Sequence, residues 1–178
     1  MKKAVFLDRD GVVNRTFLRN GKPVPPDSLE AFELLPGAEE AMRALRTAGW
    51  VLVIATNQPD VATGLQRREV VDAMHQRLRD AHLVDDIKVC FHVDADHCAC
   101  RKPLPGMLLD AAHEHGIDLR ASWMVGDRWR DIEAGQAAGC RTLFIDYHYP
   151  EKRPVADHII ASLAEAASLI LAQDFATR

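Results

Sequence analysis

The stretch Phe6-Leu7-Asp8-Arg9-Asp10-Gly11-Val12-Val13-Asn14 decides how the rest of the chain is interpreted. The apolar run at 4–7 predicts a buried strand, and two aspartates one residue apart follow it directly. In open α/β sheets, ligands bind at the carboxyl ends of the strands. Two neighbouring carboxylates repel each other unless a cation or a proton joins them. Because aspartate is also a common turn former, the motif alone leaves an ordinary strand-to-turn junction open as an alternative.

Composition limits the classes of protein that the chain can represent. Its 178 residues and 48% hydrophobic content suit one globular domain with a substantial core. The net charge of -4 argues against a nucleic-acid interface, which needs a basic face. The sequence has no apolar run of about 20 residues, so we expect no membrane span. The first apolar run ends at Asp8, too early for a signal peptide. We therefore expect a cytoplasmic monomer.

Strand and helix patterns alternate along the chain. This order predicts an α/β fold with a doubly wound parallel sheet. Residues 11–36 lack periodicity and contain several prolines, so we interpret them as a long irregular loop, or flap, beside the first strand. The chain has no large insertion for a cap domain, which leaves specificity to loops at 15–26, 58–65 and 90–102. Strands are expected near 4–7, 50–55, 87–91, 122–125, 141–145 and 157–160, and helices near 38–48, 67–82, 106–115, 130–138 and 162–172.

Polar residues collect at one edge of this expected sheet. Three carboxylates at one cleft need a cation, and oxygen ligands without histidine favour magnesium. A carboxylate there can act as a nucleophile toward phosphorus, and a second can move the proton of the leaving oxygen. Taken singly, each polar residue is more simply a turn cap or a solvated side chain. The set is Asp8, Asp10, Thr56, Asn57, Lys102, Asp127 and Asp131.

Three of the four cysteines lie close together before Arg101-Lys102-Pro103. Cys90-x-His92 and Cys98-x-Cys100 have the composition of a closed, structural zinc site, with unrelated cysteines as the alternative. His97 lies inside this segment, but the paired spacing is more regular without it. Cys140 is interpreted as a small core residue. Zinc would stiffen the loop at 90–102 and place Arg101 and Lys102 at the cleft.

Four motifs in order resemble those of haloacid dehalogenase-type phosphatases, over nearly the whole chain. They are Asp8-Arg9-Asp10-Gly11, Thr56 in Thr56-Asn57-Gln58, Lys102 in Arg101-Lys102-Pro103, and Gly126-Asp127 with Asp131. The resemblance implies that Asp8 is the nucleophile of an aspartyl-phosphate mechanism and that Asp10 is the general acid and base. It also implies a magnesium ion bound by the Asp8 side chain, the Asp10 carbonyl and Asp127, with Asp131 and Arg128 as further candidates.

Two groups in this superfamily carry the zinc loop before Arg-Lys-Pro. One removes the 7-phosphate of D-glycero-D-manno-heptose 1,7-bisphosphate in lipopolysaccharide synthesis, and the other acts on histidinol phosphate. Residues 105–109 and 124–127 resemble the first group more, whereas the short segment between His92 and Cys98 resembles the second. Thr56, Asn57 and Gln58 are candidates for contacts with the phosphate or the substrate. Either resemblance implies that Arg101 recognises the substrate and that Lys102 holds the phosphoryl group. The flap arginines Arg15 and Arg19 would reach a second anionic group, or are simply solvated.

Two alternatives without hydrolysis use similar residues. A receiver-like signalling domain also combines acidic residues, threonine and lysine, but its phospho-accepting aspartate ends a later strand. Here the third expected strand ends in the cysteine-rich loop. A zinc-stabilised binding module would leave the acidic cluster unexplained. A magnesium-dependent sugar phosphatase is therefore the favoured interpretation.

Overall fold

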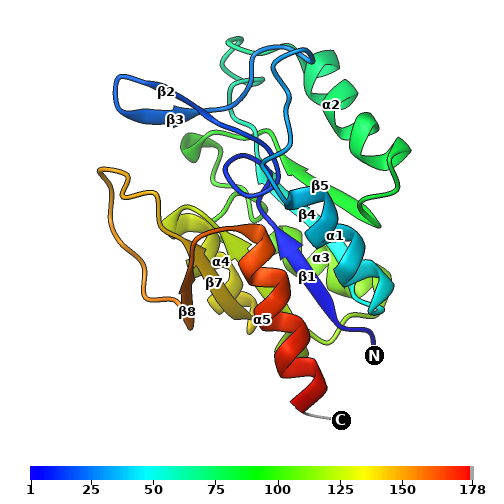
Figure 1. The fold of residues 1–178 in the computed structure, drawn as a ribbon. Coiled ribbons are helices and arrows are strands. Elements are labelled where there is room, and N and C mark those ends of the chain that lie inside the picture. Colours follow the sequence, from blue (N-terminus) through cyan, green and yellow to red (C-terminus); the bar gives the residue numbers. More distant parts are fainter. Residues whose placement is uncertain (177–178) are drawn as a thin grey trace.

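A six-stranded parallel sheet forms the centre of the molecule, in the order β5-β4-β1-β6-β7-β8 (Figure 1). The computed structural model describes residues 1–176. The first strand of the chain lies in the middle of the sheet, between β4 and β6, so its carboxyl end has neighbours on both sides. The strands are β1 (Ala4–Leu7), β4 (Val51–Asn57), β5 (Asp86–Cys90), β6 (Trp123–Gly126), β7 (Arg141–Ile145) and β8 (His158–Ile160).

Helices cover both faces of the sheet, and the strand side chains alternate between them. Val5 and Leu7 join the core beneath α1 (Ala38–Thr47), α2 (Arg68–Asp80) and α5 (Leu163–Ala176). Ala4 and Phe6 join a second core beneath α3 (Gly106–His115), and α4 (Trp129–Ala138) packs beside α3 against β6 and β7. The prediction of a doubly wound parallel sheet is confirmed.

The helix boundaries follow from local sequence. In α1 the buried side chains are Ala38, Ala41, Met42 and Leu45, which is the stripe that the apolar spacing predicts. Gly116 ends α3 in the left-handed conformation, with φ 66°. The hydroxyl of Ser162 accepts a hydrogen bond from the Glu165 N–H at 3.2 Å and so caps α5. Within residues 1–176, no helix combines the length and apolar character that a membrane crossing requires.

The flap contains a short hairpin, so the expectation of an irregular loop over residues 11–36 is wrong for residues 17–24. Strands β2 (Phe17–Arg19) and β3 (Lys22–Val24) form an antiparallel hairpin. Its turn is Asn20-Gly21, and both residues have positive φ, 53° and 73°. Such a pair suits the two-residue turns that close hairpins. The hairpin lies above the carboxyl ends of β1 and β4 (Figure 1).

Candidate active site

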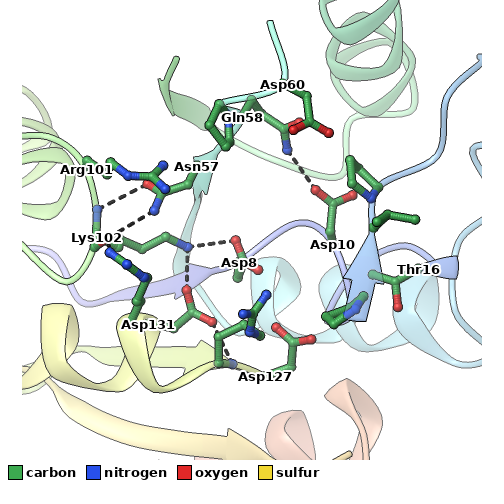
Figure 2. Close-up of a pocket in the computed structure, with 16 residues that line it drawn as sticks. Asp8, Asp10, Thr16, Asn57, Gln58, Asp60, Arg101, Lys102, Asp127 and Asp131 are labelled. Carbon is green, nitrogen blue, oxygen red and sulfur yellow. Dashed lines mark hydrogen bonds and ion pairs between the residues drawn. The ribbon is translucent and has the colours of Figure 1, made fainter. Parts of the chain in front are cut away.

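A cleft of about 250 Å³ opens at the carboxyl edge of the sheet (Figure 2). Its floor comes from the ends of β1, β4 and β6, because parallel strands bring their carboxyl ends to one edge. The loops before α3 and α4 and the β3 strand supply the walls. The lining residues are Asp8, Asp10, Thr16, Pro23, Val24, Pro25, Asn57, Gln58, Pro59, Asp60, Arg101, Lys102, Asp127, Arg128, Arg130 and Asp131.

Three buried carboxylates meet at the floor of the cleft. Asp8 directly follows β1, Asp127 directly follows β6 and Asp131 lies in the first turn of α4. One carboxylate oxygen of each lies within 4.8 Å of the others. The Asp8 N–H donates to the Val125 carbonyl at 3.0 Å, which joins the ends of β1 and β6. Lys102 Nζ lies 2.7 Å from Asp8 Oδ1 and 2.5 Å from Asp131 Oδ1. These four members of the set expected at the sheet edge lie together in the structure.

One lysine does not balance three buried carboxylates. Burial, together with the charge of Asp131, raises the pKa of Asp8 to about 7. Burial and the charge of Asp8 raise the pKa of Asp127 well above its usual value. Burial alone would lower the pKa of Lys102, but the charges of Asp131 and Asp8 raise it. Asp127 Oδ1 is buried and has no hydrogen-bond partner. The set of oxygen ligands, the excess negative charge and this unpartnered oxygen all fit a magnesium ion.

Two neighbours determine where the Asp127 carboxylate lies. Tyr149, which was missed in the sequence, forms a hydrogen bond with it, and Gly11 leaves room for it. Tyr149 Oη donates to Asp127 Oδ2 at 3.2 Å from the loop between β7 and β8. Gly11, with φ 89°, passes so close that an added Cβ would lie 2.1 Å from the same oxygen. Only glycine fits here without displacing the carboxylate.

The Asp10 side chain points away from these carboxylates, toward Gln58 (Figure 2). Gln58 Nε2 donates to Asp10 Oδ2 at 2.7 Å and to Thr56 Oγ1 at 2.9 Å. Asn57 exchanges two hydrogen bonds of 3.1 Å with the backbone of Lys102. The Thr56-Asn57-Gln58 motif therefore connects β4 both to Asp10 and to the loop that carries the lysine. Thr56 itself is buried and does not line the cleft.

Two arginines border the cleft beside Lys102. Arg101 Nε donates to Asp94 Oδ1 at 2.8 Å, and Arg130 NH1 donates to the same oxygen at 3.1 Å. Arg130 was missed in the sequence, although its place between Asp127 and Asp131 puts it in the first turn of α4. With Lys102 they make this wall of the cleft positive.

Of the other predicted arginines, only Arg128 lines the cleft. The Arg15 side chain is 56% exposed and pairs with Glu33 at 3.6 Å. Arg19 is exposed on β2, and neither residue lines the cleft. Arg128 does line it, but its guanidinium pairs with Glu151, and its carbonyl accepts from the Asp131 N–H at 3.1 Å.

The predicted zinc ligands form one cluster at the end of β5. Ligand atoms of Cys90, His92, Cys98 and Cys100 lie within 4.8 Å of one another, and His97 is outside the group. Cys90 Sγ is 3.7 Å from Cys98 Sγ and 3.0 Å from Cys100 Sγ, and Cys98 Sγ is 3.5 Å from Cys100 Sγ. A zinc ion with bonds of about 2.3 Å would separate its thiolates by about 3.8 Å. The donor set of three cysteines and one histidine fits tetrahedral zinc, as do two of the three sulfur separations. Cys140 is buried in the core, as expected.

Comparison with known proteins gives a consistent family. The model of haloacid dehalogenase-like hydrolases matches residues 24–139, more than half of the chain. The chain is 41% identical to D-glycero-beta-D-manno-heptose-1,7-bisphosphate 7-phosphatase of Bordetella bronchiseptica over 146 residues, which cover 78% of this chain and 77% of that protein. Identity to the protein of the same name from Pseudomonas aeruginosa is 37%, with 81% of each chain covered.

Solved structures agree with the sequence relatives. The crystal structure of D,D-heptose 1,7-bisphosphate phosphatase from B. bronchiseptica, complexed with magnesium and phosphate, superposes with a TM-score of 0.83. The superposition covers 96% of this chain and 99% of that one, at 34% identity. The Burkholderia thailandensis enzyme of the same name gives a TM-score of 0.65 at 30% identity, covering 96% and 99%.

Proposed function

The chain belongs to the haloacid dehalogenase-like hydrolases, and we propose that within this family it removes the 7-phosphate of D-glycero-D-manno-heptose 1,7-bisphosphate. The observation that carries the proposal is the cleft itself. It combines the carboxylate of Asp8 with an acidic cation site on one side and the positive wall of Lys102, Arg101 and Arg130 on the other. Relatives named D-glycero-beta-D-manno-heptose-1,7-bisphosphate 7-phosphatase match most of the chain.

The chemistry of the two motif aspartates follows from their positions. An Asp8 oxygen attacks phosphorus, and the bond between phosphorus and the sugar oxygen breaks. Asp10 gives its proton to the departing sugar oxygen. Asp10 then takes a proton from a water molecule that attacks the aspartyl phosphate, which releases phosphate and restores Asp8. Lys102, 2.7 Å from Asp8 Oδ1, offsets the negative charge on the phosphoryl group during both transfers.

Magnesium is the catalytic ion that we propose for this site. Asp8, Asp127 and the carbonyl of Asp10 would hold it, with Asp131 and Arg128 beside them. When bound, the ion neutralises phosphoryl oxygens. The unpartnered, buried Oδ1 of Asp127 supports this ligand set.

Zinc is the structural ion that we propose for the cysteine cluster. Four ligands leave no open position, so the site holds structure and takes no substrate. It lies directly before Arg101 and Lys102 in the chain, and Arg101 also donates to the His92 carbonyl at 3.1 Å. A rigid loop would keep both cationic side chains at the cleft.

The second phosphate of the substrate needs an anion-binding group of its own. Arg101 and Arg130 are suited to this role because both line the cleft and converge on the exposed Asp94 carboxylate, which a phosphate would replace as their partner. Arg15 and Arg19 lie outside the cleft, so they are weaker candidates for this phosphate.

Turnover of a defined panel tests the proposal. The α and β anomers of heptose 1,7-bisphosphate, histidinol phosphate and several sugar monophosphates would be compared with magnesium present. We expect one bisphosphate anomer to have the highest kcat/KM, and Asp8→Asn to abolish turnover of every compound. A large preference for histidinol phosphate would overturn the substrate assignment, and no turnover of any phosphomonoester would overturn the function. Gel filtration tests the further proposal of a monomer.

A further inference from the structure

Arg9 is the middle residue between the two motif aspartates, and its side chain is 0% exposed. An arginine keeps its charge at any physiological pH, and burying that charge is unfavourable unless partners surround it. The chemistry described above gives this side chain no role. Its partners therefore indicate what the burial achieves.

The guanidinium of Arg9 holds the carboxylate of Asp10. Arg9 NH2 lies 3.0 Å from Oδ1 and 3.0 Å from Oδ2 of Asp10, and Arg9 Nε lies 3.2 Å from Oδ1. Asn14 Nδ2 donates to Oδ1 at 2.9 Å, and Gln58 Nε2 donates to Oδ2 at 2.7 Å. Arg9 is the only cation among these donors. A carboxylate gripped on both oxygens by a planar guanidinium has a defined orientation.

Arg9 is itself fixed from two distant segments. Its NH1 lies 3.1 Å from Nε2 of His75, a buried residue on α2. Arginine can only donate, so this ring nitrogen must be the unprotonated acceptor. Burial and the positive charge of Arg9 lower the pKa of His75 to about 3, in agreement with a neutral ring. On the other side, the Arg9 guanidinium carbon lies 5.8 Å from the ring centre of Phe32.

The interior position of His75 has no other explanation in the chemistry of the site. Val71, Met74 and Leu78 share its buried face of α2, so an apolar residue would fit the pattern of that helix. A histidine at this position instead supplies a hydrogen-bond acceptor to the buried guanidinium of Arg9. The series His75, Arg9, Asp10 thus runs from the core of α2 to the edge of the cleft.

We propose that Arg9, oriented by His75, is a positioning residue that aims the Asp10 side chain, whose protonated form gives its proton to the leaving oxygen and whose carboxylate form remains after that transfer. The inference rests on the proposed function, because it assumes that Asp10 is the general acid. A purely structural ion pair is the competing explanation. In that case, loss of Arg9 would affect all substrates equally.

Leaving groups separate these explanations. A sugar oxygen must gain a proton as it departs, whereas p-nitrophenolate departs without one. The ratio kcat/KM covers the steps up to loss of the leaving group, so hydrolysis of the aspartyl phosphate does not enter it. For Arg9→Met we expect kcat/KM on heptose bisphosphate to fall about 100-fold, which is the lower range for general acid catalysis. On p-nitrophenyl phosphate we expect a fall within about threefold.

Matched variants complete the test. Arg43→Met removes an exposed arginine that pairs with Glu39 on α1, and it should leave both ratios unchanged. His75→Leu removes the acceptor and should reproduce the selective loss, to about tenfold, while the carbonyl of His75→Gln should restore most of it. If Arg9→Met fails to fold, the two His75 variants decide the question.

The results that overturn the inference differ from those that overturn the function. Equal losses on the two substrates, or no loss on heptose bisphosphate, would show that Arg9 and His75 only stabilise the fold. A wild-type protein that hydrolyses neither substrate would instead remove the proposed function itself.

Discussion

Gly11 is a residue at which the candidate magnesium site tolerates little change. Its φ of 89° strains any other residue, and an added Cβ would lie 2.1 Å from Asp127 Oδ2. Gly139 has nearly the same φ, 88°, but no atom would lie within 4 Å of its Cβ. The two positions therefore separate backbone strain from displacement of a metal ligand.

We predict that Gly11→Ala weakens magnesium binding and lowers kcat/KM by about 100-fold, because the Asp127 carboxylate must move. Gly139→Ala should cost about 1 kcal/mol of unfolding free energy, as a left-handed alanine does, and leave magnesium binding unchanged. Calorimetric titration with magnesium and thermal unfolding measure the two effects. Equal magnesium affinity in both variants would contradict this account of Gly11.

At the scale of residues, the sequence allowed most of the candidate site to be predicted. Asp8 and Asp127 follow strands, Lys102 precedes a helix, and Asp131 lies one helical turn after Asp127, so the sheet edge brings the four together. Arg9 and Tyr149 could not be found in this way. A single arginine or tyrosine is usually a surface residue unless its partners are known. His75, the partner of Arg9 on α2, and Asp127, the partner of Tyr149 after β6, are both distant in sequence.

At the scale of elements, the helix and strand patterns predicted the regular structure well, and the flap was the exception. The β2–β3 hairpin has only three residues in each strand, too few for an alternating pattern to stand out. Its prolines suggested a loop, but proline is tolerated where a strand has a free edge. The Asn20-Gly21 turn was the available signal for a hairpin.

The loop after β5 gives the prediction that belongs to this scale. Cys100→Ala removes one of the four proposed zinc ligands, so bound zinc should fall from about one per chain to near zero. We expect kcat/KM to fall about tenfold or more, because Arg101 and Lys102 lose their rigid support. Elemental analysis of freshly purified protein and steady-state kinetics measure these quantities.

Cys140→Ala is the matched control, since Cys140 lies in the core outside the cluster. It should retain zinc and activity. A zinc-free Cys100→Ala variant with full activity would mean that the loop positions Arg101 and Lys102 without the metal. Zinc retained by Cys100→Ala would instead mean that the ligand set is wrong.

At the scale of the whole molecule, the order of the strands in the sheet brings residues that are far apart in the sequence close together. The alternating pattern predicted a parallel sheet, but it did not indicate that β1 lies between β4 and β6. That central position lets the loop after β7 reach the first motif, where Tyr147 Oη donates to the Gly11 carbonyl at 3.0 Å. Contacts of this kind depend on tertiary packing, so the local periodicity of the sequence does not predict them.

The buried acidic site also couples magnesium binding to the stability of the whole chain. In the metal-free protein the pKa of Asp8 is about 7, raised from 3.8 by burial and by Asp131. Between these values the folded state keeps a proton that the unfolded state has released. The contribution of Asp8 to the unfolding free energy therefore decreases as pH rises through this window. Magnesium opposes the loss, because it binds the deprotonated carboxylates and competes with the proton.

We therefore predict that magnesium raises the melting temperature more at about pH 8 than at about pH 5.5. The affinity of the protein for magnesium should be about tenfold or more higher at the higher pH for each proton that the ion displaces. Thermal unfolding with and without magnesium at both pH values measures this. Asp8→Asn removes the titrating group, so metal-free Asp8→Asn should lose less stability than the wild type as pH rises. Because Asp127 remains buried and acidic, part of the pH dependence should persist in that variant. Equal magnesium stabilisation at the two pH values would mean that the carboxylates are already ionised without metal, and that Lys102 alone balances their charge.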